Sequence, residues 1–214
     1  MYLSVLSSEQ IKLLKKLKFL KKYGFYLAGG TSLALQIGHR TSLDFDFYTE
    51  KKFDSQKLQQ LLERKFERII LLGQAEDTLI LKINNVAVSF FRYPYRLICP
   101  LIDSENFPPM ASREDIAAMK IIAISDRGAK RDFIDIYFLL KEFSLKEIFD
   151  FTEKKYPNFN IYVGLRGLTY FTDAEKKQQR RLYFFSHSVF WNEVKKFLIE
   201  EVKKYQKQWL RQQK

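Results

Sequence analysis

Apolar residues recur at helical spacing near the start of the chain, with lysines between them. The repeat falls within residues 9–23 and is carried by Ile11, Leu14, Leu17 and Leu20. This spacing places the apolar side chains on one face of a helix. Ser7 or Ser8 offers an oxygen that caps the first turn, and Gly24 ends the helix. The pattern therefore predicts an amphipathic helix with one buried face.

A short apolar run at residues 25–28 stops at Gly29 and Gly30, which predicts a buried strand that enters a tight turn. Residues 31–37 favour a short helix that ends at Gly38. Residues 43–47 then alternate apolar and acidic side chains. A strand with this alternation carries both carboxylates on one face and the aromatic rings on the other.

The following segments continue the mixture of helix and strand. Asp54 is placed to cap a helix that runs to about residue 65. Strands are expected at residues 69–72, 78–83 and 86–91, with a turn at Asn84-Asn85 that makes the last two a hairpin.

The clearest boundary lies at Asn106-Phe107-Pro108-Pro109, because proline continues neither a helix nor a central strand. We therefore expect one domain over residues 1–106 and a helical domain over residues 107–214. Helices are expected at 112–127, at 132–143 and in two or three later segments, including a long basic helix from about residue 190.

Composition narrows the class of protein. Hydrophobic residues make up 46% of the 214 residues, which favours a folded chain over a disordered one. The single cysteine, Cys99, excludes a disulfide framework and a cysteine metal site. No segment resembles a signal peptide or a membrane span, so we expect a cytoplasmic protein without a membrane partner.

Charge points to polyanionic partners. The chain has 37 lysines and arginines against 25 acidic residues, a formal charge of +12. Residues 176–214 hold eleven basic and three acidic residues, a net of +8. Nucleic acid or phosphate-bearing small molecules fit this balance. A merely solvated helix face fits it equally well.

The chemistry is concentrated in Gly29-Gly30-Thr31, a short helix, and then Asp44-x-Asp46 on a strand. Glycines let backbone N–H groups approach phosphate oxygens, and the N-terminus of the helix adds a positive dipole. Two carboxylates on one face of a strand suit Mg²⁺, which prefers oxygen ligands and shares them with substrate phosphates. In this order, the parts predict phosphoryl transfer from a nucleoside triphosphate (NTP).

These residues resemble the signature of the AbiEii toxin family of nucleotidyltransferases. The resemblance includes the stretch 26–47, then Asp115 to Lys120, Arg127-Gly128, and Arg131 to Asp135. It extends over about residues 26–140 and leaves the last seventy residues unmatched. It implies an α+β fold, with a polymerase-β-type mixed sheet and flanking helices followed by a helical C-terminal part.

The resemblance also implies roles for particular residues. Asp44 and Asp46 would bind the metal, while Gly29, Gly30, Thr31 and Arg40 would contact the nucleotide. Lys120 lies in a helix that is apolar on nearly every side, so it must reach solvent, a carboxylate or an anion. The resemblance favours a contact between Lys120 and the triphosphate, with Asp132 rather than Asp135 orienting the lysine or the acceptor. Arg127 would join Lys120 or pair with Asp132.

One position departs from the family pattern. Polymerase-β-type enzymes carry a third carboxylate on a neighbouring strand, and the matching position here is Ser89. A serine is neither a comparable base at neutral pH nor a charged metal ligand. Three explanations are open. Another residue takes the place of the missing carboxylate, the geometry of the bound substrate activates the acceptor hydroxyl, or the protein binds NTP with little turnover.

We therefore expect a Mg²⁺-dependent nucleotidyltransferase. It would transfer a nucleoside monophosphate to a hydroxyl of RNA such as tRNA, as the toxin of a toxin–antitoxin or abortive-infection system, with a possible cognate antitoxin. The alternatives are a catalytically weak nucleotide- or RNA-binding module and an enzyme that modifies a protein hydroxyl.

Overall fold

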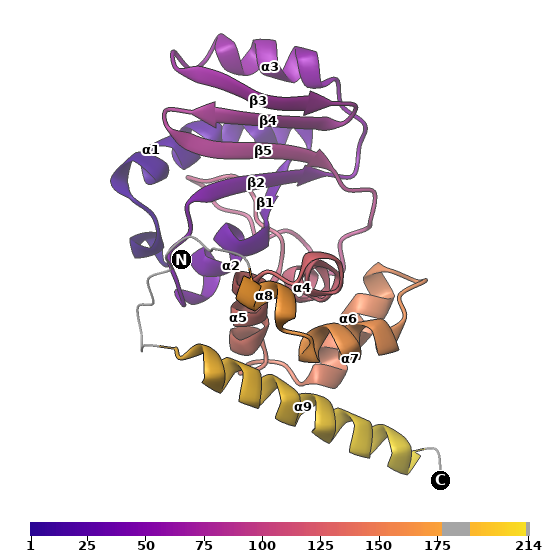
Figure 1. Ribbon diagram of the computed structural model, residues 1–214. Coiled ribbons are helices and arrows are strands. Elements are labelled where there is room, and N and C mark those ends of the chain that lie inside the picture. Colours follow the sequence, from indigo (N-terminus) through magenta and orange to yellow (C-terminus); the bar gives the residue numbers. More distant parts are fainter. Residues whose placement is uncertain (177–188, 213–214) are drawn as a thin grey trace. The chain divides into compact units, whose positions relative to one another are not determined.

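Five strands form one mixed sheet in the N-terminal half of the computed structural model, which describes residues 1–176 and 189–212. The strands are β1 (Tyr26–Ala28), β2 (Asp44–Thr49), β3 (Ile69–Ala75), β4 (Thr78–Ile83) and β5 (Val86–Arg92). Their order across the sheet is β1-β2-β5-β4-β3 (Figure 1). β2 and β5 run parallel, and the other neighbouring pairs are antiparallel. The expected mixed sheet is confirmed.

The helices of this half follow the predicted caps and stops. They are the 3-10 helices η1 (Leu3–Val5) and η2 (Leu17–Tyr23) and the α-helices α1 (Ser8–Lys16), α2 (Gly29–Ile37) and α3 (Ser55–Glu63). Ser7 caps α1 in a capping box with Gln10, and Asp54 accepts hydrogen bonds from the first turn of α3. Gly24 and Gly38 end η2 and α2 in the left-handed conformation. The single helix expected over residues 9–23 is divided between α1 and η2.

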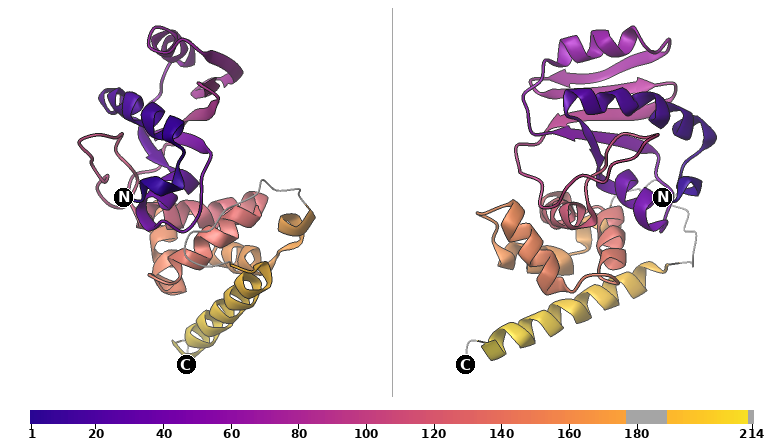
Figure 2. Two further views of the ribbon diagram at one scale, coloured as in Figure 1. Left: turned by 90° about the vertical axis from the view of Figure 1, so that its left-hand side faces the viewer. Right: turned by 180° about the vertical axis from the view of Figure 1, so that it is seen from behind.

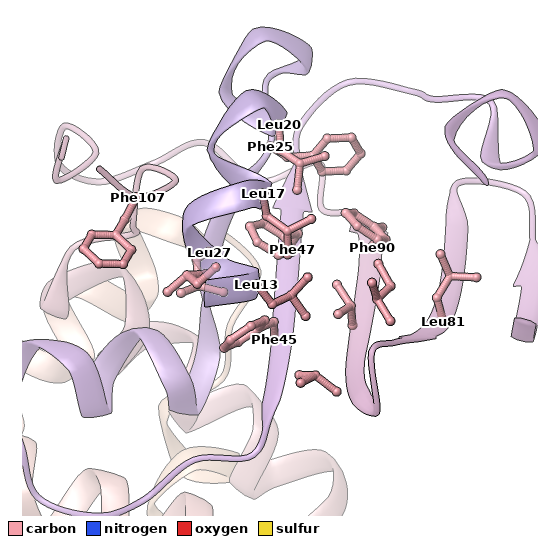
Figure 3. Packing of buried hydrophobic residues seen from close by; sticks show 14 of the residues in the cluster. Leu13, Leu17, Leu20, Phe25, Leu27, Phe45, Phe47, Leu81, Phe90 and Phe107 are labelled. Atoms are coloured by element: carbon pink, nitrogen blue, oxygen red, sulfur yellow. The ribbon is translucent and has the colours of Figure 1, made fainter. Parts of the chain in front are cut away.

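One face of the sheet is covered by α1, η2 and α3. Phenylalanines of β2 and β5 and leucines of β4 point to this face, where Leu13, Leu17 and Leu20 pack on them (Figures 2 and 3). Leu58 and Leu62 of α3 belong to the same cluster. Burial of this one face fixes which way every side chain of β2 points, because side chains alternate along a strand.

The C-terminal half is helical, as expected. After its first two helices, the described residues form four more, where the sequence predicted two or three. The helices are α4 (Arg113–Arg127), α5 (Lys130–Leu139), α6 (Leu145–Lys155), α7 (Ile161–Thr169), α8 (Thr172–Lys176) and α9 (Trp191–Gln212). α4 packs against α5, α6 and α7, and α9 packs against the same three helices (Figure 1). None of the helices in residues 1–176 and 189–212 is long and apolar enough to cross a membrane.

The chain separates into two compact units, Met1–Ser112 and Arg113–Lys214. The sequence places the boundary earlier, after residue 106. The first unit continues past that point because Phe107 and Met110 are buried in its core and Met110 forms a bridge to Leu27 of β1. The two prolines belong to this returning segment, which ends where α4 begins.

Candidate active site

Asp44 and Asp46 lie on one face of β2, an interior strand between β1 and β5. Phe45 and Phe47 alternate with them and are completely buried, whereas the two aspartates are half-buried. Two positions along a strand correspond to about 7 Å. The predicted arrangement of paired carboxylates on the face opposite the aromatic core is therefore present.

The glycine turn lies directly beside Asp46. Ala28, the last residue of β1, pairs with Asp46, and the chain then turns at Gly29 with a φ of 66°. A side chain on Gly29 would place its Cβ 3.5 Å from Oδ2 of Asp46. A Cβ at this distance would be in ordinary van der Waals contact, so glycine is favoured here by the left-handed backbone rather than by lack of space.

α2 begins at this turn without a side-chain cap. Ala28 occupies the N-cap position and makes no side-chain hydrogen bond to the helix. The first backbone N–H groups of a helix have no partner within the helix, and the helix dipole makes this end attractive to anions. The turn thus brings a helix end that favours anions next to the acidic strand.

Thr31 fastens the first turn of α2 to β2. Its hydroxyl donates to the backbone carbonyl of Asp44, and its oxygen lies 2.6 Å from the hydroxyl of Ser42. Arg40 is also buried, and its Nη1 donates to the carbonyl of Thr41 at 2.9 Å. Both residues therefore contact the segment that leads into Asp44.

Ser89 on β5 pairs directly with Asp46, and Ala87 pairs with Asp44. Because side chains of paired residues share a face of the sheet, Ser89 occupies the neighbouring position where a third carboxylate would stand. No group of three or more His, Cys, Asp or Glu side chains is arranged to hold a metal ion in the described part of the chain.

Lys120 lies in the second unit, between two carboxylates of α5. Its Nζ is 2.8 Å from Oδ1 of Asp132 and 2.6 Å from Oδ2 of Asp135. The lysine side chain is only 6% exposed and both aspartates are fully buried. Of the partners that the sequence allows for Lys120, namely solvent, a carboxylate or an anion, the structure shows carboxylates. Asp135 contacts the lysine as closely as Asp132 does.

Arg127 completes this cluster from the end of α4. Its Nε donates to Oδ2 of Asp132 at 2.9 Å and its Nη2 to Oδ1 at 3.1 Å. Burial by itself would raise the pKa of Asp132, but the charges of Lys120 and Arg127 and their hydrogen bonds outweigh it, so this pKa lies below its usual value. Asp132 is therefore ionised at neutral pH and holds two cations in place.

A second buried ion pair joins α4 to α6. Nζ of Lys155 lies 2.7 Å from Oδ1 of Asp115, and both side chains are fully buried. The sequence gives no signal for this pair, because the two residues are 40 positions apart and only the packing of α6 on α4 brings them together.

With this geometry established, comparison with known proteins decides the family. The family described as "Nucleotidyl transferase AbiEii toxin, Type IV TA system" matches residues 12–98 and 81–211. This chain belongs to the AbiEii family of nucleotidyltransferase toxins. The matches extend beyond residue 140 and include the basic C-terminal helix.

A relative from Aquifex aeolicus (strain VF5), the uncharacterized protein aq_aa25, is 39% identical over 186 residues, which covers 85% of this chain and 87% of the relative. A protein from H. pylori described as a candidate nucleotidyltransferase has a similar fold, with a TM-score of 0.52, 17% identity, and coverage of 95% of this chain and 97% of that one. The MenT4 nucleotidyltransferase toxin from Mycobacterium tuberculosis H37Rv matches with a TM-score of 0.50 and 13% identity, covering 90% of this chain and 82% of that one. The nucleotidyltransferase fold expected from the sequence is thereby confirmed.

The lowered pKa of Asp132 predicts how stability depends on pH. A carboxyl group whose folded pKa is depressed stabilises the fold above its unfolded pKa, about 3.9, and this contribution is lost as the pH falls through the folded value. We expect Asp132→Asn to be less stable than the wild type at pH 7, with the difference shrinking below about pH 4. Urea unfolding of both proteins across this range measures it. A difference that stays constant down to about pH 2.5 would show that the charge of Asp132 contributes nothing.

Proposed function

We propose that this protein transfers a nucleoside monophosphate from an NTP to a hydroxyl group of RNA, such as tRNA, and so acts as a toxin. The observation that carries the proposal is the placement of Asp44 and Asp46 on one face of β2, with the turn at Gly29 beside Asp46. Family membership supports an NTP substrate, a toxin role and a cognate antitoxin. The basic charge of the chain supports RNA as acceptor.

Two carboxylates fit Mg²⁺ when the substrate supplies further oxygens. Magnesium is commonly bound through one or two carboxylates together with substrate phosphates, so the pair Asp44 and Asp46 is sufficient without a third acid at Ser89. The metal, when bound, would neutralise charge that develops on the phosphates during transfer. Asp44 and Asp46 are its proposed ligands.

The protein would bind the phosphates through the turn at Gly29-Gly30 and the amides that open α2. Thr31 and Arg40 would contribute by holding the segment around Asp44 in place, because each donates a hydrogen bond to a backbone carbonyl of that segment. Lys120, oriented by Asp132 and Asp135, is the proposed cation at the triphosphate. The match of this part of the chain to the AbiEii family supports the role.

In the reaction, the acceptor oxygen forms a bond to the α-phosphorus and the bond from that phosphorus to the pyrophosphate oxygen breaks. The acceptor's proton passes to water or to the departing pyrophosphate, because Ser89 offers no carboxylate base beside Asp46. NTPs and tRNA are both found in the cytoplasm, where we propose that the protein acts.

Ser89 also favours a second candidate, a nucleotide- or RNA-binding module with little turnover. An enzyme that modifies a protein hydroxyl is a third. Incubation with each labelled NTP, Mg²⁺, and either RNA or protein acceptors separates the three by where the label appears. Label on protein alone would contradict the RNA proposal, and binding without transfer would favour the binding module.

We expect Asp44→Asn and Asp46→Asn to lower Mg²⁺-dependent transfer by about 100-fold or more, since each removes a charged metal ligand without changing volume. Asp103→Asn is the matched control, because it removes an exposed carboxylate from the same unit. Initial rates with labelled NTP measure the effect. Wild-type rates in both site variants would exclude this metal site.

A separate prediction concerns Lys120. Removing its charge alone would leave Asp132 and Asp135 buried with too little compensation, and the fold would be destabilised by about 3–5 kcal/mol. We therefore compare Lys120→Met/Asp135→Asn with Asp135→Asn, since the double variant leaves Asp132 paired with Arg127. NTP affinity should fall by about tenfold or more in the double variant relative to Asp135→Asn. Equal affinities by calorimetry would show that Lys120 serves only the packing of α4 on α5.

The basic helix α9 carries the third prediction. Reversing the exposed charges of Lys203, Lys204 and Lys207 to glutamate should weaken RNA binding and flatten its salt dependence, because each phosphate contact releases condensed counterions. Reversing Lys12, Lys16 and Lys22 is a control with the same change in net charge in the other unit. Anisotropy titrations at several salt concentrations measure both. The same affinity and slope in the α9 variant as in the wild type would identify this face as solvated surface.

A further inference from the structure

Two adjoining hollows lie between α7 and α9 in the second unit. Their volumes are about 310 Å³ and about 340 Å³, and Tyr162 and Leu165 line both of them. Volumes of this size lie at the lower end of the range for small-molecule sites, about 300–1,000 Å³. None of the residues proposed for NTP or metal binding lines either hollow.

The larger hollow has aromatic walls. Phe159, Tyr162, Tyr205 and Trp209 line it, together with the carboxylate of Glu153. Tyr162 and Trp209 stand edge to face with ring centroids 5.7 Å apart, yet they are 63% and 37% exposed. The other tryptophan, Trp191, is partly buried and packs on Phe133 and Phe171. Tyr162 and Trp209 instead present ring surface to solvent.

The smaller hollow is basic. Arg166 of α7 and Lys203 of α9 line it, with Thr169 and Gln206 as neutral polar neighbours. No acidic side chain lines it among the described residues. Two cations facing one hollow favour an anion, and arginine in particular matches the geometry of a phosphate.

We propose that these two hollows bind one segment of single-stranded RNA, with an unpaired base in the aromatic hollow and its backbone phosphate in the basic one. Stacking on aromatic rings is how proteins hold unpaired bases, and a basic groove follows the backbone. Glu153 accepts a hydrogen bond from an amino group on the edge of the base. The choice of RNA rests on the proposed function, while the aromatic and basic hollows together specify a nucleotide.

Trp209 provides a direct reporter. The chain has two tryptophans, so Trp191→Phe leaves Trp209 as the only one, and the replacement keeps an aromatic ring against Phe133 and Phe171. Titration with a short single-stranded RNA, without NTP or divalent metal, should quench Trp209 fluorescence saturably. A duplex RNA of the same length should quench it much less, because its bases are already stacked and paired.

Two pairs of variants separate stacking from charge. Tyr162→Ala should weaken binding of the single-stranded RNA by about fivefold or more without changing the salt slope, since stacking on a base is worth about 1–3 kcal/mol and releases no counterions. Tyr170→Ala is its control, because Tyr170 is an exposed aromatic residue that lines neither hollow. Arg166→Ala/Lys203→Ala should weaken binding and flatten the salt slope more than Lys154→Ala/Lys196→Ala, a double neutralisation of exposed lysines outside both hollows.

The proposal is overturned if RNA leaves Trp209 fluorescence unchanged, or if each variant binds RNA as its control does. Binding of polyglutamate as tight as that of RNA, and insensitive to Tyr162→Ala, would also overturn it by showing a general anion surface. These measurements need no transfer reaction. If the RNA binding predicted here is found but no nucleotide is transferred to RNA, the result contradicts the proposed function and supports this RNA-binding site. If transfer to RNA occurs but none of these variants affects binding, this site fails alone.

Discussion

Burial of Phe45 and Phe47 determines which way the two aspartates of β2 face. The strand is fixed between β1 and β5, and both rings are enclosed by the helices on one side of the sheet. A slip of one residue would exchange the rings for the carboxylates and place two charges in an apolar core, which costs far more than any loop adjustment could recover. The acidic face is thus a consequence of hydrophobic packing on the opposite face.

The glycine turn depends on the same strand. Ala28 pairs with Asp46, Gly29 approaches its carboxylate, and Thr31 donates to the backbone of Asp44. The helix end that favours anions and the strand that favours cations are therefore held together by backbone pairing and by hydrogen bonds of the Thr31 side chain. This juxtaposition is what the proposed transfer chemistry requires, since a metal–NTP complex presents both signs of charge at once.

The sequence predicts this first unit well because its signals are local. Each signal specifies one element of secondary structure. The alternation of apolar and acidic residues over 43–47 specifies a strand, glycines mark turns and helix ends, and Ser7 and Asp54 cap the helices that follow them. The second unit is predicted less completely. The apolar surroundings of Lys120 predict that it has a partner, but the sequence favours Asp132 alone, whereas Asp135 contacts the lysine as well. The ion pair of Asp115 with Lys155 is not predicted at all. Those contacts depend on how the helices pack against one another. The spacing of apolar residues shows which face of a helix is buried but not which helix covers it. The hollows between α7 and α9 are missed for the same reason.

The central claim is that the metal–NTP complex binds at the turn and strand described for the first unit. Paramagnetic broadening of backbone amide signals tests it most directly, with Mn²⁺ in place of Mg²⁺ and an NTP added to the isotope-labelled full chain. The account predicts that the signals of Gly29, Gly30, Asp46 and Ser89 are lost at the lowest Mn²⁺ concentrations. Broadening centred on any other part of the chain, or none at these residues with NTP bound, would contradict it.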